Sequence, residues 1–276
     1  MKISVIIPTY NRRESLCKAL DSVLSQSYMP NEIIVIDDGS SDNTDKMIAN
    51  KYPRIRYIHQ PHSGVSSARN NGILNSVNHW IAFLDSDDKW NKNKLKTQTK
   101  LLTINPEYKI CHCNEIWFKN GKQINQKKKH QKNGGYIFKK CLPLCVISPS
   151  SVIIHRDIFN SIGTFDESLP ACEDYDLWLR ICSKYPLLYA EEKLVEKYGG
   201  HPDQLSTKYW GMDRFRIKSL ANLLDSGILS DTQRKNAIDT LKYKLNIYIN
   251  GAQKHNNEVA AEDFKMLAKL YSDSQP

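Results

Sequence analysis

Short apolar runs alternate with helix-spaced apolar positions along the first part of the chain. The runs cover residues 3–7, 33–36, 55–58 and 80–84. Because they are unbroken, they predict strands that are buried on both faces. Between them, apolar residues recur every three or four positions, which predicts helices. These positions are Leu16, Leu20, Val23, Leu24, Met47, Ile48, Val65, Ala68, Gly72 and Ile73.

The order of these elements over residues 1–90 is β-α-β-α-β-α-β, which is typical of a parallel, doubly wound sheet with right-handed crossovers. Asn11, followed three residues later by Glu14, predicts a capping box at the start of the first helix. Ser41 and Asp42 are expected to cap the second helix.

The second half of the chain predicts fewer strands and more helix. Residues 148–154 favour a further strand, and Glu173 and Asp174 open a helix that continues through Leu177. From Trp210 onward, apolar residues at helix spacing predict about three helices, with breaks near Gly227 and Gly251. We therefore expect an α/β domain over residues 1–208, with halves 1–100 and 101–208, and a helical appendage over residues 209–276.

The composition is that of a globular protein. The chain has 276 residues, 39 basic and 30 acidic side chains and a net charge of +9. No apolar run approaches the roughly 18 residues that span a bilayer, and the first run lacks the pattern of an export signal, so we expect a cytoplasmic location. Seven scattered cysteines indicate reduced thiols. For Cys111 and Cys113, alternation along a strand is a simpler explanation than a zinc site.

The basic charge is concentrated in one segment. Between Lys92 and Lys140 there are thirteen lysines and two acids, a local charge of 13 − 2 = +11. Lysine without arginine suits a diffuse attraction to an anionic surface, which predicts peripheral contact with the inner face of the cytoplasmic membrane. A solvated loop is the alternative. Specific nucleic-acid binding is not expected, because no recognised nucleic-acid-binding motif accompanies the lysines.

Polar residues follow three of the predicted strands, at residues 8–11, 37–40 and 85–88. Ligands of doubly wound sheets bind beyond such strand ends. The first loop lacks the glycine pattern of a dinucleotide site, and no P-loop sequence is present, so a dehydrogenase is not expected. The oxygens of Asp85, Ser86, Asp87 and Asp88 suit Mn2+ or Mg2+ shared with substrate phosphates. A metal that neutralises a departing nucleoside diphosphate indicates sugar transfer from a nucleotide sugar; an acidic surface loop is the alternative.

Four segments at these positions, VIIPTYN (5–11), VIDDGSSD (35–42), GVSSARNNG (64–72) and FLDSDD (83–88), resemble the family 2 glycosyltransferases. The resemblance implies the GT-A fold, a Rossmann-like, doubly wound, mostly parallel sheet with helices on both faces. It also implies that the first half of the domain binds the nucleotide sugar. The implied nucleotide-binding residues are Pro8, Thr9, Tyr10, Asn11, Asp38, Arg69, Asp85 and Ser86. The implied metal-binding residues are Asp87, Asp85 and Asp88.

The acceptor half is expected to supply the base that deprotonates the attacking hydroxyl, and a carboxylate is the economical choice. The resemblance of residues 173–180 to the family places that role on Asp174, with Glu173 as the second choice, and implies inversion. Residues 198–206 resemble a mobile loop of the family, in which His201 would touch the diphosphate or the metal. Tyr198 departs from the family, because many relatives carry a basic residue there.

The leading hypothesis is a metal-dependent, inverting glycosyltransferase that uses a nucleotide sugar, by family habit a UDP-sugar. Its acceptor would be a saccharide or a lipid-linked saccharide in the synthesis of a surface polysaccharide or a glycolipid. The alternative is a catalytically silent member that binds a nucleotide or a saccharide and acts through its helical tail. Nucleotidyl transfer is disfavoured, because residues 8–11 contain no glycine-rich triphosphate loop. The C-terminal helices could also pair subunits into a homo-oligomer.

Overall fold

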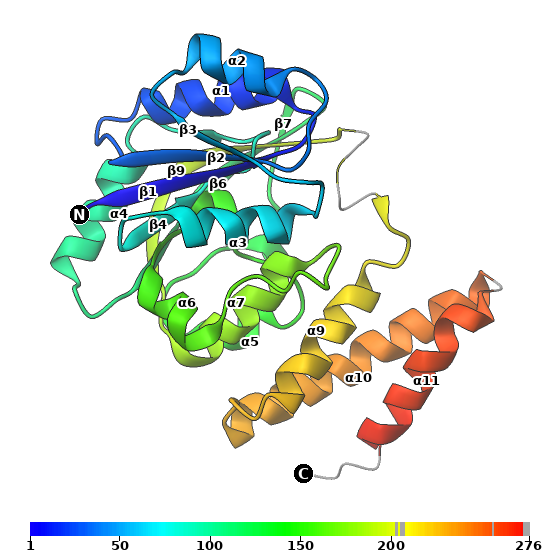
Figure 1. Ribbon diagram of the computed structural model, residues 1–276. Helices are drawn as coiled ribbons and strands as arrows, with labels where there is room; N and C mark the ends of the chain where they lie inside the picture. The colour runs from blue at the N-terminus through cyan, green and yellow to red at the C-terminus, as the bar shows by residue number, and fades with distance from the viewer. Residues whose placement is uncertain (202–203, 205–207, 256, 273–276) are drawn as a thin grey trace.

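The computed structural model describes residues 1–201, 204, 208–255 and 257–272. It shows a mixed α/β domain in which one curled sheet carries helices on both faces, followed by a group of C-terminal helices (Figure 1). The predicted fold class is therefore confirmed.

Within the described residues the sheet has nine strands in the order β3-β2-β1-β4-β8-β6-β9-β5, and β7 pairs with β6 at its side. The strands β3, β2, β1 and β4 are parallel, as are β6 and β9, whereas β8, β5 and β7 run antiparallel to their neighbours. The bounds are β1 Ile3–Thr9, β2 Glu32–Asp37, β3 Arg56–His59, β4 Trp80–Phe83, β5 Lys89–Trp90, β6 Ile110–Lys119, β7 Lys122–Ile124, β8 Ile153–His155 and β9 Leu188–Gly199.

The helices lie on both faces of this sheet and at the end of the chain. Their bounds are α1 Arg13–Leu24, α2 Thr44–Lys51, α3 Val65–Asn75, α4 Lys94–Ile104, α5 Phe138–Cys141, α6 Arg156–Ile162, α7 Glu173–Lys184, α9 Asp213–Asp225, α10 Asp231–Lys254 and α11 Glu258–Ser272. Two short 3-10 helices, η1 Lys128–His130 and η2 Pro149–Ser151, lie in the loops.

Two hydrophobic cores, one on each face of the sheet, explain why the first strands are apolar throughout. On β1, Val5 and Ile7 pack with Leu16 and other residues of α1, α2 and α4, whereas Ile6 packs with α3 and α7 on the opposite face. A Cβ added to Gly72 of α3 would lie 2.3 Å from Cγ2 of Ile6. The glycine therefore allows α3 to approach β1 closely.

The capping box predicted from Asn11 and Glu14 is wrong, because a side chain distant in sequence replaces it, whereas Asp42 of the predicted Ser41–Asp42 cap does contact the start of the second helix. Asn11 has a left-handed backbone (φ 48°), and its Oδ1 accepts a hydrogen bond from the Ser41 N–H at 2.8 Å. The first helix begins at Arg13, whose N–H donates to Asp42 Oδ2 at 2.9 Å. The second begins only at Thr44, whose hydroxyl donates to the other oxygen of Asp42. Asp42 thus holds the starts of α1 and α2 together.

Other differences concern strand length and exposure. The predicted strand over residues 148–154 is a 3-10 helix followed by the short strand β8, and β3 is a partly exposed edge strand. Leu24, predicted to face the core, is 41% exposed. The prediction for the two cysteines is confirmed, because Cys111 and Cys113 lie on alternate positions of β6 with their side chains in one core.

The C-terminal helices continue the core on the side of α7. Residues of α9 and α10, such as Leu220 and Leu241, belong to the same apolar cluster as Trp178 of α7. The predicted breaks near Gly227 and Gly251 are both confirmed, although Gly251 itself lies in the last turn of α10, which ends at Lys254. The domain division at residue 208 and the pairing of subunits both stay predictions. No helix among the described residues is both long enough and apolar enough to cross a membrane.

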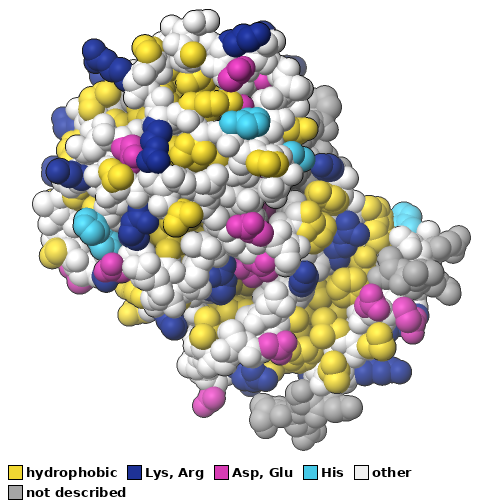
Figure 2. All heavy atoms as spheres, in the orientation of Figure 1, with side chains coloured by type: hydrophobic (Ala, Val, Ile, Leu, Met, Phe, Trp, Pro, Cys, Tyr) yellow, Lys and Arg dark blue, Asp and Glu magenta, His cyan; other side chains and the backbone are white. Residues whose placement is uncertain are grey.

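The same helices carry apolar side chains on their outer surface. Figure 2 shows a broad hydrophobic area over the part of the molecule that Figure 1 labels α9, α10 and α11. On α10, Tyr243 is 66% exposed and Ile247 is 46% exposed, and on α11 Met266 is 57% exposed.

Candidate active site

The candidate site lies at the carboxyl end of β4 and the amino end of α7, which one buried arginine joins. Arg69 of α3 donates from Nη1 to Glu173 Oε1 and from Nη2 to Asp85 Oδ1, both at 2.7 Å. Its side chain is 4% exposed. Burial raises the pKa of Asp85, but attraction to Arg69 and to nearby lysine and arginine outweighs it and leaves that pKa below its ordinary value. The arginine thus fixes α7 against the acidic strand end.

The other two acids after β4 are also held by the protein. Asp87 pairs with Arg12 at 2.5 Å. Asp88 is buried and accepts hydrogen bonds from Ser150 Oγ at 2.7 Å and from the Tyr198 N–H at 3.1 Å. Burial and the neighbouring carboxylates raise the pKa of Asp87 and, more strongly, that of Asp88. This concentration of negative charge would attract a cation.

The donor set after β4 fits a metal that is shared with a substrate. Its oxygens are hard ligands, and Mg2+ or Mn2+ is commonly held by one or two carboxylates together with substrate phosphates. In the described part of the chain, however, no three His, Cys, Asp or Glu side chains lie close enough to enclose an ion. The predicted residues Asp85, Asp87, Asp88 and His201 therefore form no ready-made cage.

His201 nevertheless lies on the same cavity as Asp87. This cavity has a volume of about 430 Å³ and opens at the start of α1, where Asn11 and Arg12 also line it. The predicted loop over residues 198–206 lies partly outside the described residues.

The predicted nucleotide residues lie around the ends of β1 and β2. Asp38 is buried, and its carboxylate accepts hydrogen bonds from Gln60 Nε2 at 2.7 Å and from the backbone N–H groups of Ser63 and Gly64, both at 2.8 Å. His62 Nδ1 lies 2.8 Å from the same carboxylate. These four contacts of Asp38 are all with protein groups, and they hold the loop before α3 in place.

Tyr10 presents an aromatic surface beside that loop. It is 43% exposed, and its ring stacks on His62 with centroids 4.1 Å apart. Thr9, at the end of β1, is buried, and its Oγ1 has no hydrogen-bond partner among the described residues. Pro8 is buried within β1, and Ser86 is buried in the turn after β4. A buried hydroxyl without a partner, like that of Thr9, is unusual in a protein interior.

Of the two candidate bases, Asp174 is the less constrained. Glu173 is 5% exposed and tied to Arg69, and burial together with the adjacent Asp174 raises its pKa. Asp174 is half-buried; its Oδ1 accepts from the Tyr175 N–H at 2.7 Å, and its Oδ2 accepts from Cys145 Sγ at 3.3 Å. Asp174 can therefore face a substrate, whereas Glu173 serves the ion pair.

Sequence reasoning missed Lys197 of β9, which faces four carboxylates from separate segments. Burial lowers its pKa, but attraction to Asp88, Glu115, Asp85 and Asp174, in that order, raises the pKa above its ordinary value. The hydroxyl of the next residue, Tyr198, contacts Lys89 and Glu196. Side chains alternate between the two faces of a strand, so the sequence could have placed Lys197 only if β9 had been predicted as a strand.

This strand order, with the acidic turn after β4 and the carboxylates at the start of α7, defines the GT-A fold. The structure of S. aureus TarS 1–349 in complex with UDP-GlcNAc matches with a TM-score of 0.72 over 96% of this chain and 80% of that one, at 20% identity. Mannosyltransferase PcManGT from Pyrobaculum calidifontis, in complex with GDP-Man and Mn2+, matches with a TM-score of 0.60 over 98% and 84%, at 15% identity.

Residues 4–163 match the family Glycosyl transferase family 2, and the chain belongs to that family. An uncharacterized glycosyltransferase of Rickettsia felis is 36% identical over 191 residues, which are 66% of this chain and 30% of the relative. This chain thus spans about a third of that relative. The Escherichia coli UDP-Glc:alpha-D-GlcNAc-diphosphoundecaprenol beta-1,3-glucosyltransferase WfgD is 32% identical over 207 residues, 67% of this chain and 77% of the relative.

Proposed function

We propose that the chain is a glycosyltransferase that moves a sugar from a UDP-sugar to a saccharide carried on a lipid diphosphate, with inversion. The observation that carries the proposal is the buried link from Asp85 through Arg69 to Glu173. It fixes an acidic turn suited to a metal and a diphosphate beside the carboxylate of Asp174. A leaving group at the acidic turn and a base at Asp174 would thereby lie near each other.

The nucleotide would lie along the ends of β1 and β2. Thr9 offers a buried hydroxyl without a partner, and Tyr10 offers an exposed ring on which a base could stack. Asn11 lines the adjoining cavity, and Asp38 holds the loop before α3. The similarity to WfgD, a UDP-Glc glucosyltransferase, and to TarS in complex with UDP-GlcNAc supports this choice of donor.

A divalent metal, Mn2+ or Mg2+, would be held by Asp87 with help from Asp85 and Asp88, and His201 lies on the same cavity. When bound, it would supply positive charge for the diphosphate. Lys197 adds a second cation from the opposite side of the acidic turn, because it is attracted by Asp88 and Asp85.

The proton of the acceptor hydroxyl would pass to Asp174 as the hydroxyl oxygen bonds to the anomeric carbon of the donor. The bond from that carbon to the diphosphate breaks at the same time, and the nucleoside diphosphate leaves with the electron pair. A single base opposite a single leaving group favours inversion. Cys145 stays protonated, because burial and the Asp174 charge raise the pKa of its thiol, so it holds the base by donating a hydrogen bond.

The test is the variant Asp174→Asn, assayed with UDP-glucose and N-acetylglucosamine linked through a diphosphate to an undecyl chain. Loss of a general base should lower kcat by about 10²–10⁴-fold while the shift in Tm caused by UDP with Mn2+ is kept. Asp157→Asn, at an exposed pair with Lys109, is the control and should keep full activity. Retained activity in Asp174→Asn would remove it as the base. Nucleotide binding without any transfer in the wild type would favour the catalytically silent alternative.

The cellular setting belongs to the same proposal. We infer a cytoplasmic enzyme at the inner face of the membrane, where a lipid-linked acceptor would be present. The basic segment is one argument for this location, although two of its thirteen lysines, Lys94 and Lys132, are buried.

A further inference from the structure

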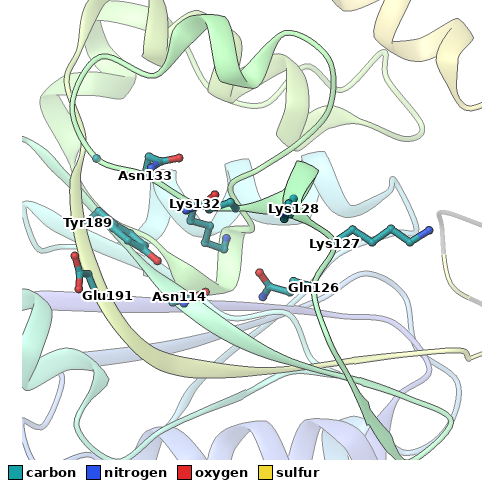
Figure 3. A pocket seen from close by; sticks show the side chains of 10 residues that line it. Asn114, Gln126, Lys127, Lys128, Lys132, Asn133, Tyr189 and Glu191 are labelled. Carbon is teal, nitrogen blue, oxygen red and sulfur yellow. The ribbon is translucent and has the colours of Figure 1, made fainter.

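A second polar cavity lies beyond β6 and β9, beneath the chain segment 126–134 (Figure 3). Its volume is about 660 Å³. Asn114 of β6 and Tyr189 and Glu191 of β9 line one side. Lys127 and Lys128 also line the cavity, at its rim, and Figure 3 shows the Lys127 side chain extending away from Asn114 and Tyr189. This cavity is separate from the one beside Asp87.

A single buried ion pair separates the cavity from the candidate active site. On the cavity side, Glu115 Oε1 lies 3.1 Å from Lys132 Nζ, and Gln126 Nε2 donates to the backbone oxygen of Glu115 at 3.0 Å. On the other side, Glu115 attracts Lys197, which also faces Asp85. The cavity therefore adjoins the side of the site where Glu115 and Lys197 meet.

The strand register gives the separation. Ala82 of β4 and Cys111 of β6 both pair with Ile153 of β8, so Asp85 and Asn114 lie at the same level of the sheet. β8 stands between β4 and β6, and two strand spacings amount to about 10 Å. This distance matches one sugar ring together with its attached phosphate.

The cavity offers charge and hydrogen-bond donors that the protein leaves unused. The Lys127 and Lys128 ammonium groups and the Tyr189 hydroxyl donate to no acceptor in the described ranges, and both lysines are exposed. The charge of Lys132 is balanced by Glu115, so Lys127 and Lys128 outnumber the remaining acid, Glu191. An anionic, hydroxyl-rich ligand fits this lining better than a neutral one.

We propose that this cavity binds the diphosphate of a sugar-diphosphate acceptor, with the acceptor sugar directed toward Asp174. The inference rests on the proposed function, because it names the acceptor subsite of that reaction. It gives Lys127 and Lys128 a specific anionic ligand in place of a diffuse attraction to a membrane surface.

The test compares Lys127→Ala/Lys128→Ala with Lys139→Ala/Lys140→Ala in the full chain. The second pair is exposed, belongs to the same basic segment and does not line the cavity, so the change in charge is matched. The probes are the undecyl diphosphate of N-acetylglucosamine and undecyl N-acetylglucosaminide, which lacks the diphosphate. Binding of each probe is measured by calorimetry without a donor, and KM is measured with UDP-glucose.

We expect Lys127→Ala/Lys128→Ala to weaken binding of the diphosphate probe and raise its KM by about tenfold or more, because charged hydrogen bonds are lost. Its effect on the glycoside, and the effect of the control pair on either probe, should stay below about twofold. Equal effects of the two double variants, or failure of the wild type to bind the diphosphate probe, would overturn the inference.

Two further outcomes separate the cavity assignment from membrane binding by the lysines and from the proposed function. If both double variants equally lose binding to vesicles of anionic phospholipid and equally lose the diphosphate probe, the lysines serve the membrane surface and the cavity assignment is wrong. If the wild type binds the probe in a manner that depends on Lys127 and Lys128 but transfers no sugar, the cavity assignment holds and the proposed function fails.

Discussion

The contribution of the buried ion pair between Glu115 and Lys132 to the free energy of unfolding can be tested quantitatively. The two side chains are 1% and 2% exposed. Burial raises the pKa of Glu115, but Lys132, Lys197, Ser148 and Trp117 together lower it from 4.5 to about 2. That difference corresponds to roughly 3 kcal/mol of stabilisation at neutral pH.

The variant Lys132→Met should therefore be strongly destabilised at pH 7, by about 3–5 kcal/mol, because it leaves a buried carboxylate without its nearest cation. The pH dependence has a definite sign. In the wild type, the pKa of Glu115 is lower in the folded than in the unfolded chain, so its contribution is present above pH 4.5 and is lost as the pH falls toward 2. The variant lacks most of that contribution, so the difference between the two proteins should shrink below pH 4.5.

Urea unfolding followed by circular dichroism at pH 7 and at pH 4 measures both effects. Lys109→Met, which breaks an exposed pair with Asp157, is the control and should leave the midpoint unchanged. The double variant Glu115→Gln/Lys132→Met should recover most of the loss, because no buried charge is left unpaired. A loss under about 1 kcal/mol, or a loss that does not vary with pH, would refute this role of the pair.

Four other substitutions test separate parts of the structure. Gly72→Ala should lower the free energy of unfolding by about 1–3 kcal/mol, because the added Cβ would collide with Ile6. Gly251→Ala, where the added Cβ meets open space, should raise it by about 0.5–1 kcal/mol. Thermal unfolding of the two variants measures both effects. Burial lowers the pKa of Lys94 to about 8, so the stability of the wild type should rise with pH from 8 toward 10.5. The variant Lys94→Met should abolish that rise and should be at least as stable as the wild type at pH 7. Arg69→Met should lower stability by about 3–5 kcal/mol and abolish transfer, as measured by urea unfolding and a UDP-release assay.

The first half of the fold was predictable because its signals are local. Four apolar runs become β1 to β4, and the polar residues that follow them meet at one edge, since parallel strands place their carboxyl ends together. The strand β9 gave no such signal, and for β6 only the alternation of Cys111 and Cys113 indicated a strand. β6 buries His112 and Glu115 among its apolar residues, and β9 is rich in charge, so neither has the composition of an internal strand.

The acidic residues of the candidate site were predictable from the sequence, but the basic residues that pair with them were not. Asp85 and Asp174 follow recognisable element ends, but the bridge from Arg69 to Glu173 joins residues 104 positions apart. Lys197 depends on the register of β9, which shifts twice against β6 near Asn114. Such long-range pairings are determined by packing of the whole sheet, and one sequence read locally does not contain them.

The pairing of charges explains why Asp174 and Lys197 are the groups left for chemistry. Arg69 holds Asp85 and Glu173, Arg12 holds Asp87, and Lys132 holds Glu115, so these acids are neutralised by fixed cations. Among the described residues, Asp174 forms no ion pair, and the Lys197 ammonium makes no hydrogen bond although four carboxylates attract it. Two of the fixed cations are arginines, whose planar groups bind carboxylates with defined geometry, whereas a lysine on a flexible stem can move to an incoming phosphate. Under the proposed function, Asp174 would then accept the proton, and the Lys197 ammonium would meet the leaving diphosphate.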